Sequence, residues 1–150
     1  MMDVSQITEE FLRSIDVHTV LPQQEPFVMI GTLVGFSMTS SITETVVRED
    51  CIFVDDGVMS PYGMLENIAQ TCAARVGFYN RYILNNEVRT GFIAAVRDYR
   101  INRLPSVGST IVTTVDIIEE IFGMTLATAR ICQDGEVIAC TQVKLSVREQ

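Results

Sequence analysis

A long apolar segment without proline constrains the fold of this chain more than any other feature. It begins at Ser60, a good helix N-cap, and Pro61 suits the first helical position. No proline follows until well past Asn85, which predicts a helix of roughly 24 residues, about 36 Å long. Apolar residues occur on most sides of this helix, so we expect it to be buried in the protein interior.

The two faces of the predicted helix differ in the size of their side chains. One face is apolar and carries Leu65, Ile68, Cys72, Val76, Tyr79 and Ile83. The opposite face carries Glu66, Ala69, Gln70, Ala73 and Gly77. Small residues on this second face allow another element to approach the helix closely.

Strand patterns dominate the rest of the chain. A short helix is expected at 7–15 and an extended or turn-like segment at 21–26, where two prolines occur. Strands are expected before the long helix at 27–36 and 41–47, and after it at 91–96, 110–121, 124–132 and 136–147. Asp134-Gly135 predicts a hairpin turn between the last two. One buried helix and an antiparallel sheet predict an α+β fold, with the sheet wrapped around the helix.

The composition indicates a single domain, 1–150, and excludes several functions. The chain has 150 residues, 11 Lys and Arg, 19 Asp and Glu, and a net charge of −8. Nucleic acids and anionic membranes are therefore not expected as partners, because both attract basic surfaces. The first residues do not resemble a secretion signal, and charges interrupt every apolar run, so we expect a cytoplasmic protein without a membrane span.

The cysteines show no metal-binding spacing, and no metal or other cofactor is expected. They are Cys51, Cys72, Cys132 and Cys140. A two-residue turn at 134–135 would place Cys132 opposite Val137 and Cys140 opposite Ala129, so these two should not form a disulfide. We expect all four to be reduced thiols.

Several segments resemble, in the same order, the 3-hydroxyacyl-ACP dehydratases, where ACP is acyl carrier protein. Segment 21–30, Leu-Pro-Gln-Gln-Glu-Pro-Phe-Val-Met-Ile, resembles their Leu-Pro-His-Arg-x-Pro stretch. Segment 66–70, Glu-Asn-Ile-Ala-Gln, resembles their helix motif Glu-x-x-Ala-Gln. Segments 91–96 and 107–108 resemble the strand and turn that follow. The short run 53–61 before the helix is similar to the ApeP-like variant found in aryl-polyene and related pigment clusters.

The resemblance implies a hot-dog fold and a dimer that acts on acyl thioesters. It implies that Glu66 transfers a proton, and that Gln70 orients this carboxylate or a water molecule. The N–H groups near Gly63 and Met64 would hold the thioester oxygen, with Gly57 permitting close backbone approach. On residue type alone, a structural carboxylate near a helix N-terminus is the favoured interpretation of Glu66. Gln70 is equally a buried amide, and the glycines are equally turn or packing residues.

This sequence departs from the family at the histidine. Gln23 occupies the position where the ApeP-like pattern has His, and an amide cannot exchange a proton near neutral pH. The only histidine, His18, lies five residues upstream and has a structural or solvent-facing role by default. Asp55, Asp56 and Cys51 lie in the loop where other dehydratases keep their histidine, and a solvated acidic loop is the simpler interpretation.

Three functions remain open from the sequence. The first is a 3-hydroxyacyl-ACP dehydratase-like enzyme of fatty-acid or polyene synthesis, with an ACP or coenzyme A thioester as substrate, as a homodimer or with a related hot-dog subunit. The second is a catalytically degenerate subunit that binds acyl chains or completes a partner's site. The third is a hot-dog thioesterase, which also uses a helix carboxylate.

Two further expectations concern the substrate. The acyl tunnel should end among apolar side chains such as Met64, Phe78 or Phe92. Arg97, Arg100 and Arg103 form the densest arginine cluster, and an acidic carrier protein would need such a local basic patch on an acidic body. A solvated strand end is the alternative interpretation of the arginines.

Overall fold

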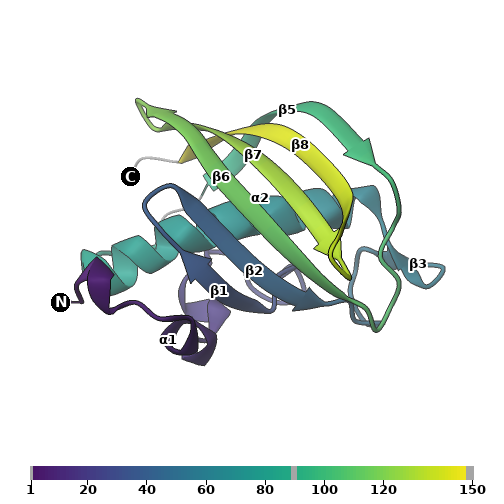
Figure 1. Cartoon of the computed structure of the whole chain (residues 1–150), viewed down its shortest axis with the longest axis horizontal. Coiled ribbons are helices and arrows are strands. Elements are labelled where there is room, and N and C mark those ends of the chain that lie inside the picture. The colour runs from purple at the N-terminus through teal and green to yellow at the C-terminus, as the bar shows by residue number, and fades with distance from the viewer. Residues whose placement is uncertain (1, 89–90, 148–150) are drawn as a thin grey trace.

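The computed structural model describes residues 2–88 and 91–147 and shows a curved antiparallel sheet wrapped around the long helix α2 (Figure 1). Helix α2 spans Pro61–Phe78 and continues as a π-helical segment, Tyr79–Ile83. The Ser60 hydroxyl caps the helix by accepting a hydrogen bond from the N–H of Gly63. The buried helix predicted from residue 60 onward is therefore confirmed, with π geometry in its final turn.

The main sheet has the strand order β1-β2-β6-β7-β8-β5, and every neighbouring pair is antiparallel. Its strands are β1 (Thr32–Phe36), β2 (Ser40–Val46), β5 (Gly91–Ile101), β6 (Thr110–Ile121), β7 (Met124–Gln133) and β8 (Glu136–Val147). Strands β1 and β5 form the two edges of the sheet, and α2 lies in its concave side (Figure 1).

Short elements precede β1 and follow β2 in the sequence. Near the N-terminus these are η1 (Val4–Gln6), α1 (Glu9–Ser14) and η2 (Val17–Thr19). A small hairpin of β3 (Val54–Asp55) and β4 (Val58–Met59) precedes α2. Its turn contains Asp56 and Gly57, both with positive φ. None of the described helices is long and apolar enough to span a membrane.

Two sequence predictions need correction. The strand expected at 27–36 begins only at Thr32, because side chains of α2 bind the backbone of residues 27–29 and hold it away from the sheet. In the last hairpin Cys132 lies opposite Val137 as predicted, but Cys140 lies opposite Arg130. A register shift after Ile131 displaces the pairing by one residue. All four cysteines are free, as expected.

The core consists of two hydrophobic clusters along α2. Met64, Ile68 and Cys72 pack against the sheet together with Ile111, Ile131 and Val143. Phe78 and Ala74 pack against the N-terminal segment, including Leu12, Val20 and Leu33. The helix is therefore buried between the sheet on one side and residues 12–33 on the other.

A buried polar seam joins α2 to β2 and β6. The Ser41 hydroxyl donates to the carbonyl of Thr71 at 2.7 Å, and the hydroxyls of Thr43 and Thr71 are 2.7 Å apart. The Thr113 hydroxyl donates to Asn67 Oδ1. Buried polar groups are costly unless they are paired, so these bonds fix which face of α2 meets the sheet.

Gly77 marks the closest approach of α2 to another segment. A Cβ added there would lie 1.8 Å from the carbonyl oxygen of Val20. The helix and the backbone at Val20 therefore touch directly, as the row of small residues on this helix face predicted.

We expect Gly77→Ala to destabilise the protein by about 3 kcal/mol or more, because backbone must move to admit the methyl group. Chemical denaturation measures this loss. Gly57→Ala is the control: its added Cβ meets no atom within 4 Å, and its positive φ costs only about 1–2 kcal/mol. If Gly77→Ala were as stable as the unmodified protein, the close contact would be wrong.

Candidate functional site

A pocket of about 280 Å³ lies between α2, β5 and the ends of β7 and β8. Glu66 of α2 and Gln23 of the Leu-Pro segment both line it. The structure therefore brings the helix carboxylate and Gln23, the position at which the sequence analysis expected a family histidine, into one cavity. Its apolar wall consists of Ala69, Ala73, Val76, Phe92, Ile93 and Leu145.

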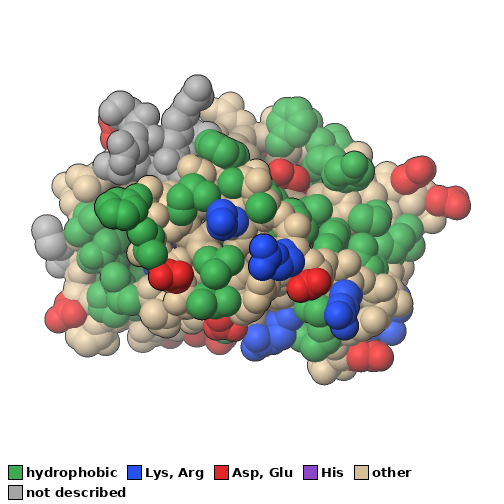
Figure 2. Space-filling model, turned by 90° about the horizontal axis from the view of Figure 1, so that it is seen from above, with side chains coloured by type: hydrophobic (Ala, Val, Ile, Leu, Met, Phe, Trp, Pro, Cys, Tyr) green, Lys and Arg blue, Asp and Glu red, His purple; other side chains and the backbone are tan. Residues whose placement is uncertain are grey.

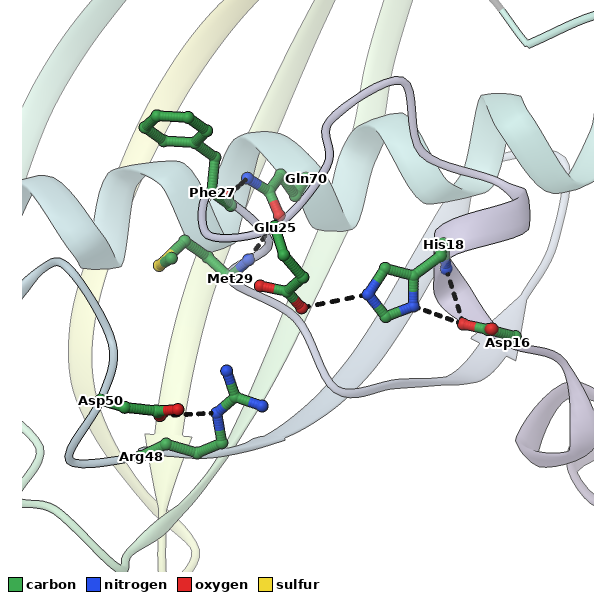
Figure 3. Close-up of polar contacts among 8 residues, drawn as sticks. All are labelled: Asp16, His18, Glu25, Phe27, Met29, Arg48, Asp50 and Gln70. Carbon is green, nitrogen blue, oxygen red and sulfur yellow. Dashed lines mark hydrogen bonds and ion pairs between the residues drawn. The ribbon is translucent and has the colours of Figure 1, made fainter.

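Gln70 connects Glu66 to the segment that carries Gln23. Its Oε1 accepts from the N–H of Met29 at 2.7 Å, and its Nε2 donates to the carbonyl of Phe27 at 2.8 Å (Figure 3). The same Nε2 donates to Glu66 Oε2 at 3.0 Å. The amide is completely buried and both its ends are used. Gln70 is thus a buried structural amide that also contacts the Glu66 carboxylate, and its role in orienting that carboxylate for a reaction stays a prediction.

Asn67 is a positioning residue that the sequence analysis did not identify. Its Nδ2 donates to the carbonyl of Met29 at 2.8 Å. Asn67 therefore binds the backbone acceptor of Met29, whereas Gln70 binds the backbone donor of the same residue. Asn67 is completely buried. Asn has a low helix propensity, so its presence inside an apolar helix was the sequence feature that could have indicated a buried polar role.

Gln23 lines the pocket and carries an unpaired oxygen. Its Oε1 is buried and has no hydrogen-bond partner among the described residues. Unpaired buried polar atoms are rare in folded proteins. A rotation of the Gln23 side chain would be needed to bring this oxygen to a ligand in the pocket.

The expected thioester-oxygen donors are not available. The N–H of Gly63 donates to the Ser60 hydroxyl at 3.2 Å, and the N–H of Met64 donates to the Ser60 carbonyl at 3.1 Å. Both groups take part in the first turn of α2, so neither N–H is free in this structure, and their role as thioester donors stays a prediction. Gly63 packs closely on Phe53 and Met59, where an added Cβ would come within 2.7 Å. Gly57 lies in the β3–β4 turn and does not line the pocket.

Two hydroxyl-bearing residues line the pocket instead, Thr125 at the start of β7 and Ser146 near the end of β8. Thr125 is buried and pairs with the buried Leu145, so its side chain lies on the helix side of the sheet, whereas Ser146 alternates with Leu145 and its side chain lies on the other face. Neither was singled out from the sequence, because serine and threonine are common in strands and only the curvature of the sheet brings these two strand ends to Glu66.

His18 lies outside this pocket. It lines a different cavity of about 210 Å³ together with Asp16, Glu25 and Arg48. Its Nδ1 contacts Asp16 Oδ1 and its Nε2 lies 3.0 Å from Glu25 Oε1 (Figure 3). Hydrogen bonds to Asp16 and then Glu25 raise the pKa of His18 above its ordinary value. His18 is therefore an ion-pairing residue of the N-terminal segment and cannot replace the missing histidine at Glu66.

The other titratable candidates are also separated from Glu66 or inert. Cys51 lines the His18 cavity, and Asp55 and Asp56 are exposed in the β3–β4 hairpin. Cys72 does line the Glu66 pocket, but burial raises the pKa of its thiol to about 11. Cys72 is thus protonated at neutral pH and does not supply a thiolate nucleophile.

The residues expected at the end of an acyl tunnel separate into two groups. Phe92 of β5 lines the pocket. Met64 and Phe78 are completely buried in the two core clusters. The wall of the pocket along α2 combines the small residues Ala69 and Ala73 with Cys72 and Val76, which the sequence analysis had placed on the other helix face.

The three arginines lie on and just after the edge strand β5. Arg97 and Arg100 are exposed, whereas Arg103 donates to Glu136 at 3.4 Å. Arg97 and Lys144 line the same shallow hollow on the sheet. Figure 2 shows Lys and Arg side chains grouped among hydrophobic ones on the face seen from above.

The edge strand β5 exposes apolar side chains next to the pocket. Phe92 is 55% exposed and Val96 is 40% exposed. One side of β5 pairs with β8, and no described strand pairs with its other side.

Comparisons with known proteins agree with this architecture. The dehydratase heterocomplex ApeI:P from Xenorhabdus doucetiae matches with 17% identity and a TM-score of 0.85, covering 92% of this chain and 94% of that chain. A hypothetical thioesterase with coenzyme A from Streptococcus pneumoniae matches with 8% identity and a TM-score of 0.60, covering 79% and 85%. The protein smu.793 from Streptococcus mutans, bound to acetyl-CoA, matches with 11% identity and a TM-score of 0.65, covering 87% and 97%.

These likenesses confirm the hot-dog fold. No curated protein matches the sequence. The family model described as ApeP dehydratase matches residues 15–149. The chain therefore belongs to the ApeP-like dehydratase family.

Proposed function

We propose that this protein dehydrates a 3-hydroxyacyl thioester, with Glu66 as the proton-transfer residue. The observation that carries the proposal is the shared pocket of Glu66 and Gln23, which has an apolar wall on one side and a hydroxyl group on another. An acyl chain needs the apolar wall, and the reacting carbons need a carboxylate beside them.

The reaction requires one proton to leave Cα and one to reach the departing oxygen. Glu66 takes the Cα proton, and the electron pair of that C–H bond becomes the Cα–Cβ double bond. The Cβ–O bond breaks, and the hydroxyl leaves as water after receiving a proton from the Glu66 carboxyl. Gln70 holds Glu66 Oε2 through the reaction, which keeps the carboxylate aimed at the pocket.

Gln23 binds the substrate in this scheme and does not transfer a proton. Its side-chain amide lines the pocket and, after a rotation that exposes its unpaired Oε1, accepts a hydrogen bond from the 3-hydroxyl group near Glu66. The Thr125 hydroxyl is the protein donor suited to the thioester oxygen, since the N–H groups of Gly63 and Met64 are already used.

The substrate carrier is ACP or coenzyme A, and the setting is cytoplasmic fatty-acid or polyene synthesis. We further propose that the protein pairs through β5 with a second hot-dog subunit, either its own copy or a related chain. An exposed apolar strand edge is a template for another strand, and pairing would cover Phe92 and Val96. The name of the ApeI:P heterocomplex supports a related partner.

A catalytically degenerate partner subunit is the second candidate, and Gln23 is the observation that favours it. In that function the pocket binds an acyl chain while another subunit performs both proton transfers. A thioesterase ranks third: the helix carboxylate suits it, and release of free thiol without enoyl product would identify it.

Glu66→Gln should lower dehydration by roughly a hundred- to ten-thousand-fold, because an amide cannot accept and return a proton. Stability should change little, since the new amide oxygen can still accept the bond from Gln70. Enoyl product formation and thermal unfolding are measured together. Glu49→Gln, on an exposed Glu, is the control. Wild-type turnover in Glu66→Gln would make the carboxylate architectural and favour the partner-subunit function.

Gln23→His should increase dehydration, by up to about a hundredfold, because it restores a second group able to exchange protons. The pH–rate profile should gain a limb near the imidazole pKa of about 6.5. Gln24→His, at the exposed neighbouring position, should do neither. An unchanged rate and profile in Gln23→His would contradict a site organised around these two positions.

The protein should be a dimer of 16.7 kDa chains by light scattering when no other subunit is added. Val96→Lys should shift it to monomer, because a charge on an edge strand opposes pairing. Val137→Lys is the matched control, since both valines are 40% exposed. A monomer that also fails to pair with any related hot-dog chain would contradict the assembly.

Replacing Arg97, Arg100 and Arg103 together by Ala should weaken binding of an acidic carrier protein by about tenfold or more, with a smaller salt dependence. The charge-matched control replaces Arg13, Arg48 and Arg81, which are exposed elsewhere. Calorimetry with acyl-ACP measures both variants. Equal affinity of the two variants would exclude this docking surface.

A further inference from the structure

The Glu66 pocket has a neighbour farther along α2. A second cavity, of about 350 Å³, is lined by Val76 and Thr125, and these two residues also line the Glu66 pocket. Its remaining walls come from Asn80 and from residues 120–124 at the tip of the β6–β7 hairpin. That hairpin tip lies at the same end of the molecule as the C-terminal half of α2 (Figure 1).

The residues that line the two cavities form one row on the helix. Glu66, Ala69, Ala73, Val76 and Asn80 recur at intervals of three and four, the spacing of a single helix face. The rise of the helix places Val76 about 15 Å and Asn80 about 20 Å beyond Glu66. At roughly 1.2 Å per bond of an extended chain, these lengths correspond to about 12 and about 16 bonds.

The far end of this row is apolar surface without a described partner. Phe122 is 100% exposed at the hairpin turn, and Ile118 and Ile121 are about half exposed. Phe122 and Gly123 both have positive φ, at 50° and 79°, as a tight two-residue turn requires. Large apolar side chains grouped on a surface indicate a binding site.

The polar groups of the second cavity do not oppose an acyl chain. Glu120 lines it, but its carboxylate forms an ion pair with the nearly buried guanidinium of Arg75. The charge of Glu120 is therefore compensated within the protein. Asn80 lies at the end of the row, where a chain terminus would reach solvent.

We infer that the protein accepts long acyl chains, whose distal part passes between Val76 and Thr125 and ends under the β6–β7 hairpin. This inference rests on the proposed acyl-thioester function and specifies its substrate class. Chains of up to about 12 bonds stay within the Glu66 pocket. Longer chains reach the second cavity and bury Phe122.

Phe122→Trp provides a direct readout, because the chain contains no tryptophan. Hexadecanoyl-pantetheine, kept below its micelle concentration, should shift the tryptophan emission to the blue. Octanoyl-pantetheine should bind, as measured by calorimetry, without shifting the emission. The measurement needs no turnover and is independent of the catalytic assignment of Glu66.

Val76→Phe should block the passage, because Val76 is half-buried and a larger side chain there fills the space common to both cavities. Affinity for hexadecanoyl-pantetheine should fall by about tenfold, the effect of losing several buried CH₂ groups. Octanoyl-pantetheine affinity should fall by much less, because a chain of about eight bonds ends short of Val76. Val137→Phe, on an exposed valine outside both cavities, is the matched control.

The outcomes separate the two claims. Binding of both thioesters with no emission shift, or with equal shifts, overturns the long-chain inference and leaves the acyl-binding pocket intact. Binding of neither thioester by calorimetry overturns the proposed function and the inference with it. A shift only with the long chain, abolished by Val76→Phe, supports the inference.

Discussion

The pair of amide side chains that hold the backbone of Met29 is the interaction on which the rest of the site depends. Gln70 accepts from the Met29 N–H, and Asn67 donates to the Met29 carbonyl. Both amides are completely buried, where an unpaired polar group costs about 1–3 kcal/mol. Together they attach the segment after the Leu-Pro motif to the middle of α2, much as a strand would be held by its neighbour.

That attachment explains why Glu66 and Gln23 meet. Gln70 reaches the Met29 and Phe27 backbone with one end and Glu66 with the other, so one side chain fixes the segment and the carboxylate at once. The polar seam from Asn67 to Thr113 sets the rotation of α2 against the sheet. With that rotation fixed, Glu66, Ala69, Ala73 and Val76 of the helix line the pocket, while Met64, Ile68 and Phe78 fill the core.

Local sequence patterns predicted the helices and strands of the fold, but they did not predict most of the contacts between these elements. The cap at Ser60 and the absence of proline gave the extent of α2, and alternation gave the strands after it, because both depend on neighbouring residues. The strand predicted from residue 27 begins only at Thr32. The sequence could not show this, because an apolar segment has the same pattern whether its backbone pairs with a strand or with side-chain amides of a helix. The pairing of Cys140 with Arg130, one residue from the predicted Ala129, results from a register irregularity between β7 and β8 that the sequence does not reveal. Glu66 and Gln70 could be identified from the family motif, whereas Asn67 and Thr125 acquire their roles only when distant segments meet.

If Glu66 removes the Cα proton of a bound 3-hydroxyacyl thioester, solvent exchange measures that step most directly. A 3-hydroxyacyl-pantetheine is incubated with the protein in D₂O, and the recovered substrate is examined by NMR and mass spectrometry. We expect deuterium at Cα with the unmodified protein and none above background with Glu66→Gln. Recovered substrate that remains fully protonated at Cα, although calorimetry shows it bound to the unmodified protein, would contradict the claim.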